Sequence, residues 1–228
     1  MCGRFTLRAS TQQIVDQFRL TTMPEWQPRY NIAPTQQVPI VRPAEKRHSR
    51  QLTFARWGLI PSWAKEASIG NRMINARAET LAEKPSFRAA FKVRRCLVVA
   101  DGYYEWQPID GAKQPFYIHL DDHGLLGFAG LWESWPGPTG APPSDPLESC
   151  TIITTAANEF TSHIHDRMPV LLQPEDYDRW LDPELQPSEG LWDLLQPYAA
   201  DDLVADTVST HVNSPKHEDA QCVEPVSD

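Results

Sequence analysis

The chain has 228 residues and a formal net charge of −9, and its hydrophobic content of 41% with eight tryptophans is typical of a globular protein. This composition excludes a disordered chain, and no apolar run in the sequence is long enough to span a bilayer. The sequence does not start with the basic-then-apolar pattern of a signal peptide, so we expect a cytoplasmic protein without a membrane partner. The length predicts a single domain over residues 1–228.

Charge is distributed unevenly along the chain. Residues 1–100 contain 17 lysine and arginine against 6 aspartate and glutamate residues, whereas residues 101–228 contain 4 against 24. The asymmetry favours a basic face, formed by the first half, that binds phosphate groups locally although the whole protein is acidic. The alternative is that the two halves interleave in the fold and neutralise each other, and the sequence leaves both open.

The four cysteines, Cys2, Cys96, Cys150 and Cys222, lie far apart and form no CxxC pair. This spacing predicts free thiols in a reducing compartment, without a disulfide framework, a zinc site or an iron–sulfur cluster. We therefore expect neither a metal nor another cofactor.

The elements predicted for the first half follow one another irregularly, with no internal repeat. Ser10 is expected to cap an amphipathic helix that ends at Phe18. Residues 96–100 form the most apolar β-like run, and Asp101-Gly102 after it predicts a hairpin that returns over residues 103–106. The other elements predicted here are strands at 37–41 and 51–57 and a helix at 84–91, which has a proline near its start.

The second half alternates short strands and helices. The segment 135–146 is rich in proline, glycine and serine and is predicted to be an exposed loop. From Asn213 the chain is polar, so this tail is expected to lie over the surface or to fray. Strands are predicted at 115–120, 125–132 and 150–155, and helices at 158–165, 174–181 and 191–195. All elements together predict a β-rich α+β fold with a barrel-like or two-sheet core of mostly antiparallel strands and peripheral helices.

Cys2 occupies a position that changes what a cysteine can do. Methionine aminopeptidases act when residue 2 is small, so the mature chain is expected to begin at Cys2, with an α-amine and a thiol on one carbon framework. Such a 1,2-aminothiol traps aldehydes: the amine forms an imine, and the thiolate closes a five-membered ring with an effective molarity on the order of 10⁵ M. The alternative, which the dipeptide alone favours, is a small buried hydrophobic residue.

Six short motifs occur in a fixed order along the chain. They are MCGRF at 1–5, RYNIAPT at 29–35, RWGLIP at 56–61, INARAET at 74–80, ADGYYEW at 100–106 and IHDRMP at 164–169. In this order and spacing they resemble the SRAP family, the SOS response-associated peptidases or abasic-site processing proteins. The resemblance implies a single α+β domain on a β-barrel-like core, over about residues 2–212, and covalent capture of abasic sites in single-stranded DNA. We expect a monomer.

The resemblance implies four catalytic residues: Cys2, Asn75, Glu105 and His165. Glu105 lies between two aromatic residues, which predicts partial desolvation and a pKa raised toward values useful for acid–base catalysis. His165 can shuttle a proton or hold a phosphate oxygen, and the carboxamide of Asn75 can position the Cys2 amine or a sugar hydroxyl. Without the resemblance these would be a solvent-facing carboxylate, a structural histidine and a turn residue.

The resemblance also implies DNA contacts by Arg4, Arg77 and Arg167, because guanidinium groups match phosphate geometry. Trp63 is a candidate platform on which a base beside the lesion stacks. Here the chain departs from family members that have paired tryptophans in this stretch. The alternative for the arginines is ordinary surface ion pairing.

Two other functions remain open from the sequence. One is a cysteine peptidase, with Cys2, Glu105 and His165 as a triad that removes Met1 autocatalytically. The other is a single-strand binder without chemistry, whose binding depends on salt but not on the lesion. An acetylated Cys2 separates the crosslinking and peptidase functions, since only the first requires a free α-amine.

Overall fold

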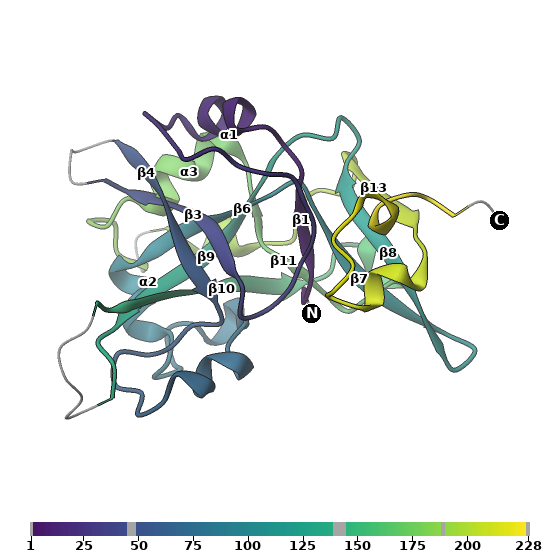
Figure 1. Cartoon of the computed structure of the whole chain (residues 1–228). Coiled ribbons are helices and arrows are strands. Elements are labelled where there is room, and N and C mark those ends of the chain that lie inside the picture. Colours follow the sequence, from purple (N-terminus) through teal and green to yellow (C-terminus); the bar gives the residue numbers. More distant parts are fainter. Residues whose placement is uncertain (1, 45–48, 139–144, 188–189, 227–228) are drawn as a thin grey trace.

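A computed structural model describes residues 2–44, 49–138, 145–187 and 190–226 (Figure 1). Its centre is a closed β-barrel, because β10 pairs with both β4 and β9 and so joins the two ends of the strand order β10-β4-β3-β6-β9. All pairs around the barrel are antiparallel except β4 with β10. Its strands are β3 (Gln37–Pro43), β4 (Arg50–Trp57), β6 (Arg95–Ala100), β9 (Leu126–Trp135) and β10 (Leu147–Ala156). The predicted α+β class and barrel-like core are confirmed.

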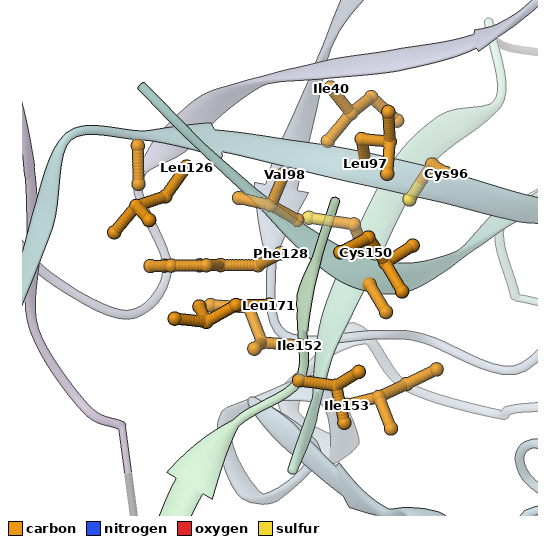
Figure 2. Close-up of a cluster of buried hydrophobic side chains, with 14 of the residues drawn as sticks. Ile40, Cys96, Leu97, Val98, Leu126, Phe128, Cys150, Ile152, Ile153 and Leu171 are labelled. Carbon is orange, nitrogen blue, oxygen red and sulfur yellow. The ribbon is translucent and has the colours of Figure 1, made fainter. Parts of the chain in front are cut away.

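Three short strands extend the barrel. β5 (Asn75–Arg77) pairs parallel to β10, β11 (Arg167–Pro169) pairs antiparallel to β10, and β12 (Leu171–Leu172) pairs with β9. The barrel interior is filled by aliphatic and aromatic side chains such as Val98, Phe128 and Ile152, all fully buried (Figure 2). This apolar burial is the main stabilising contribution to such a core.

A second sheet packs beside the barrel in the strand order β13-β8-β7-β1-β2, on the right of Figure 1. Its strands are β1 (Phe5–Leu7), β2 (Arg29–Ile32), β7 (Gly102–Ile109), β8 (Ala112–Leu120) and β13 (Leu203–Thr207). β7 and β8 form a hairpin whose turn residues, Asp110 and Gly111, both have positive φ (48° and 82°). Both sheets therefore contain strands from both halves of the sequence.

The hairpin predicted at Asp101-Gly102 is wrong. β6 lies in the barrel and β7 lies in the second sheet, so the chain crosses between sheets at this point and does not turn back. The buried carboxylate of Asp101 holds the crossing, because it accepts hydrogen bonds from the Thr6 hydroxyl and the backbone N–H groups of Arg8 and Ala9.

Gly102 is required by close packing and not by a turn conformation. A Cβ atom at this position would lie 2.4 Å from the ring of Tyr117 on β8. Asp101 is therefore needed as a buried hydrogen-bond acceptor and Gly102 as a small residue. Together they form the same Asp-Gly dipeptide that is common in tight turns, which explains the wrong prediction.

Helices are few and short. The predicted cap at Ser10 is confirmed: its hydroxyl accepts from the N–H of Gln13, whose side chain accepts from the N–H of Ser10. The helix predicted at 84–91 begins only at Arg88, after turns that include Pro85, and the one predicted at 158–165 is a single 3₁₀ turn. The helices are α1 (Thr11–Phe18), α2 (Arg88–Val93) and α3 (Tyr177–Leu181), and the 3₁₀ turns include η1 (Ala67–Arg72), η2 (Ala78–Thr80), η3 (Thr161–His163), η4 (Pro174–Asp176), η6 (Trp192–Leu195), η7 (Thr210–Asn213) and η8 (Ala220–Cys222).

The predicted loop at 135–146 lies only partly within the described residues, since 139–144 fall outside them. Trp135, at its start, still belongs to β9 and donates its indole N–H to the Ala64 carbonyl. Among the described residues no helix is long and apolar enough to cross a membrane.

The segment after Asn213 is held against the second sheet. Glu218 accepts from the backbone N–H groups of Tyr30 and Asn31 on β2. The carboxamide of Asn31 in turn donates to three carbonyl groups of residues 212–217. Cys222 is fully buried, and Val226 donates its N–H to Thr207 at the end of β13.

Candidate active site

The N-terminal residues enter the protein beside β7. Phe5 lies opposite Tyr103, and the Tyr104 N–H donates to the Arg4 carbonyl, so the residues before Arg4 run toward Glu105. Cys2 is fully buried in the chain that still carries Met1, and its thiol lies 3.9 Å from the Arg4 carbonyl oxygen. Burial raises the pKa of the Cys2 thiol far above its usual range, and the charge of Glu105 raises it further. The thiol is therefore protonated at neutral pH.

Asn75 joins Cys2 to the barrel. β5 places Asn75 opposite Ile152 of β10, and its carboxamide Nδ2 donates to the Cys2 carbonyl oxygen at 2.7 Å. The Oδ1 atom of Asn75 is buried and accepts no hydrogen bond from any residue that the structure describes. A buried acceptor of this kind is costly unless another donor reaches it. The Oδ1 atom of Asn75 is therefore available as an acceptor beside Cys2.

Glu105 is the buried carboxylic acid of the site. Its residue is only 3% exposed, and burial raises its pKa to about 7, against the opposing effect of the positive N-terminal charge. Its Oε2 atom lies 4.0 Å from Nε2 of His165. The sequence-based expectation of a desolvated carboxyl at this position is confirmed, and a pKa near 7 suits a group that both gives and takes protons.

His165 has a defined tautomer. Its Nδ1 accepts the backbone N–H of Arg167 (3.0 Å) and also lies 2.9 Å from a carboxylate oxygen of Asp166, and it cannot accept from one while donating to the other. The Asp166 side chain is 87% exposed and can turn to water, whereas the backbone N–H of Arg167 is fixed. Nδ1 therefore accepts from Arg167 and carries no proton. Burial also lowers the pKa of His165. The ring is therefore neutral at pH 7, with its proton on Nε2, toward Glu105.

An open pocket of about 370 Å³ lies over these two groups. It is lined by Glu105, Trp106, Lys113, His165 and Asn213, from β7, β8, the turn before β11 and the end of η7. Trp106 donates its indole N–H to the Asn213 carboxamide at 2.7 Å, which joins two walls of the pocket. Sequence reasoning missed Lys113 and Asn213 as residues of the site. Lys113 could have been noticed, because it is one of only four lysine and arginine residues in the acidic half.

The arginines implied as DNA contacts differ in how they are held. Arg4 is half-buried and donates from Nη1 to Asn31 and the Val212 carbonyl, which makes it a tie between the N-terminus and the C-terminal segment. Arg167 makes two hydrogen bonds to the exposed carboxylate of Glu79. Arg77 is exposed, and within the described ranges its side chain forms no hydrogen bond or ion pair.

Trp63 is 58% exposed, in the turn that follows Pro61. So large an apolar surface in water is consistent with a stacking platform. The two charged halves interleave, as one of the sequence-based alternatives held, and many arginines of the first half pair with carboxylates of the second. These pairs are Arg8–Asp101, Arg29–Glu218, Arg42–Glu148, Arg50–Asp178 and Arg94–Glu133.

A barrel whose parallel strand β5 supplies Asn75 to the chain start, next to a buried glutamate that lies 4.0 Å from a partly exposed histidine, defines a distinct class of protein. The family model described as "SOS response associated peptidase (SRAP)" matches residues 1–215. The chain belongs to this family.

Named relatives and solved structures agree with this assignment. "Abasic site processing protein YoqW" of Bacillus subtilis is 46% identical over 98% of this chain and 99% of its own length. "Abasic site processing protein HMCES" of Gallus gallus is 32% identical over 89% of this chain and 69% of its own. A crystal structure of a protein from Bacteroides thetaiotaomicron superposes with a TM-score of 0.87 at 26% identity, covering 99% of this chain and 100% of that one.

Proposed function

We propose that the protein processes abasic sites in DNA by crosslinking itself to them, in single strands, through Cys2. The observation that carries the proposal is the buried carboxyl of Glu105, with a pKa of about 7, placed beside the chain start and 4.0 Å from His165. The names of the relatives support abasic sites as the substrate. The open deoxyribose of such a site offers an aldehyde, which is the group that a 1,2-aminothiol traps.

The reaction has two bond-forming steps. After Met1 is removed, the α-amine of Cys2 adds to the aldehyde carbon, and loss of one water gives an imine. The Cys2 sulfur then adds to the same carbon while the thiol proton passes, through a base, to the imine nitrogen. The product is a thiazolidine, so protein and DNA are joined with the loss of one water in total.

Glu105 is suited to both proton transfers. At neutral pH a carboxyl with a pKa of about 7 is present in both forms, so it can protonate the departing hydroxyl and then accept the thiol proton. That second role matters because burial keeps the Cys2 thiol protonated. The Nε2–H of His165 faces the same carboxyl and can hold a sugar or phosphate oxygen.

Asn75 positions the reacting residue. Its Nδ2 holds the Cys2 carbonyl, which fixes the direction in which the amine and the thiol point. Its buried Oδ1 is available to accept from the Cys2 amine or a sugar hydroxyl. Fixed orientation of this kind supplies much of the rate advantage of an intramolecular ring closure.

The DNA strand is held outside this pocket. The exposed guanidinium of Arg77 offers its donors to phosphate directly, and Arg167 can exchange Glu79 for a phosphate at little cost because that carboxylate is exposed. Trp63 offers an exposed surface for base stacking. Arg4 instead stabilises the site by donating a hydrogen bond to the Val212 carbonyl.

The peptidase alternative fits the geometry less well. A cysteine peptidase needs its thiolate activated by a neighbouring histidine. In the described part of the chain the Cys2 thiol contacts the Arg4 carbonyl, and His165 directs its Nε2 to Glu105. The arrangement supports acid–base work on an imine better than thiolate formation.

The decisive experiment is intact-mass spectrometry of the protein after incubation with a single-stranded oligonucleotide that contains one abasic site, followed by denaturation. We expect a species with the mass of both partners less one water. Cys2→Ala should abolish it, because the remaining amine forms only a hydrolysable imine. Persistence of the stable adduct in this variant would overturn the proposal.

Two controls make the result specific. Cys150→Ala removes another fully buried thiol, in the barrel, and should leave the adduct unchanged. Protein that retains Met1, or whose Cys2 is acetylated, keeps the thiol but lacks the free amine. It should form no adduct, whereas any activity that depends on the thiol alone would survive.

A further inference from the structure

A second group of chemically active side chains lies in the C-terminal segment and shares no residue with the pocket at Glu105. His211 stands on η7, and Asp219 and Cys222 stand at the start and end of η8. The Nε2 atom of His211 lies 3.2 Å from both carboxylate oxygens of Asp219, and one ligand atom from each of the three residues lies within 4.8 Å of the others. Two elements separated by a loop thus bring an imidazole, a carboxylate and a thiol to one point.

This donor set is chemically selective. Imidazole nitrogen, thiolate sulfur and carboxylate oxygen are the ligands of Zn²⁺, which binds them at about 2.0–2.3 Å in a tetrahedron. Two donors of such a tetrahedron lie about 3.3 Å apart, close to the observed separation of His211 and Asp219. A hard cation such as Mg²⁺ would not select the sulfur.

The surroundings orient the three side chains. The His211 ring stacks on His217 with centroids 3.8 Å apart and planes 6° from parallel, and Nδ1 of His217 hydrogen-bonds the His211 carbonyl. Asp219 accepts the N–H of Gln221. Cys222 is fully buried, whereas Asp219 is exposed, so the group is closed on one side and open to solvent on the other. A fixed ligand set with one open side is typical of a three-ligand zinc site with water as the fourth ligand.

We propose that His211, Asp219 and Cys222 form a binding site for Zn²⁺. This goes against the expectation from cysteine spacing, which recognises only paired cysteines and so overlooks a mixed site. Zinc would join η7 to η8, and η7 carries both Val212, which holds Arg4, and Asn213, which lines the pocket. The ion would therefore stabilise one wall of the pocket without contacting the reacting atoms.

The test uses the full chain with the Cys2→Ala substitution, so that the N-terminal thiol cannot bind metal. Chelator-stripped protein is titrated with Co²⁺ and then with Zn²⁺ against a chromophoric chelator. We expect one equivalent of Co²⁺ with a thiolate-to-metal charge-transfer band, displaced by Zn²⁺. Cys222→Ser should remove the band and weaken Zn²⁺ binding more than about tenfold.

Asp219→Asn provides a variant that should keep the fold, because Asp219 is exposed and an asparagine oxygen can still accept the N–H of Gln221. It should keep the band, weaken Zn²⁺ binding more than about tenfold and lose the rise in melting temperature that Zn²⁺ gives the parent protein. Asp206→Asn is the matched control, since His119 and Asp206 form a similar pair (3.1 Å) without a cysteine. Absence of a Zn²⁺-displaceable band in the parent protein, or equal affinity in all variants, would overturn the proposal.

Discussion

Asp101 and Glu105, at the start of β7, are two buried carboxylic acids four residues apart whose surroundings differ. Asp101 is surrounded by donors: the Thr6 hydroxyl, two backbone N–H groups and the Arg8 guanidinium at 3.5 Å. Glu105 instead faces a neutral imidazole at 4.0 Å, and burial raises its pKa to about 7. With the same degree of burial, Asp101 serves as a hydrogen-bond acceptor that holds the chain crossing, whereas the pKa of Glu105 rises into the range of a group that gives and takes protons.

The largest effect that this contrast predicts is on chemistry at Glu105. Glu105→Gln keeps the shape of the side chain but removes its titration, so the rate of adduct formation should fall about 10²- to 10⁴-fold at pH 7. The rate is measured by quenching the oligonucleotide reaction at intervals and resolving the adduct under denaturing conditions. An unchanged rate would show that Glu105 is merely a buried residue.

Asp101 should show the reverse pattern. Asp101→Asn places an amide where three N–H or O–H donors converge, so the free energy of unfolding should fall by about 2–4 kcal/mol. Denaturant unfolding measures this loss. The adduct rate per folded molecule should stay close to that of the parent protein, and a loss of rate without a loss of stability would break the distinction between the two acids.

The smallest effect is a pH dependence of stability. The pKa of Glu105 is raised from 4.5 to about 7, so the folded state holds a proton that the unfolded state releases between these values. Its contribution to stability is therefore complete below about pH 4.5, declines as pH rises, and is lost above about pH 7, a change of roughly 3 kcal/mol.

Parallel unfolding curves for the parent protein and Glu105→Gln at pH 5, 6 and 7.5 isolate this contribution. The difference between the two proteins should change steadily over this range and level off at the upper end. A difference that is independent of pH would mean that Glu105 ionises normally.

Local rules succeeded where the decisive interactions are local. Ser10 and Gln13 lie one helical turn apart, so the capping box could be predicted from their spacing. They failed at Asp101-Gly102, because Asp101 binds the Thr6 hydroxyl and Gly102 packs against the Tyr117 ring, and one of these contacts spans 95 residues of sequence. They also overestimated the helix at 158–165: Asn158 caps the segment by accepting the N–H of Thr161, but only a single 3₁₀ turn follows.

The sequence by itself determined the family and the α+β class, because motif order and side-chain chemistry are written along the chain, and it predicted a site formed by Cys2, Asn75, Glu105 and His165. Only the tertiary structure decided how these residues meet. Asn75 reaches Cys2 because β5 pairs parallel to β10, and Glu105 on β7 of the second sheet lies 4.0 Å from His165 in the turn before β11. Tertiary contacts also decided that Arg4 and Arg167 are held by protein partners while Arg77 is exposed, since pairing depends on distance in space and not in sequence.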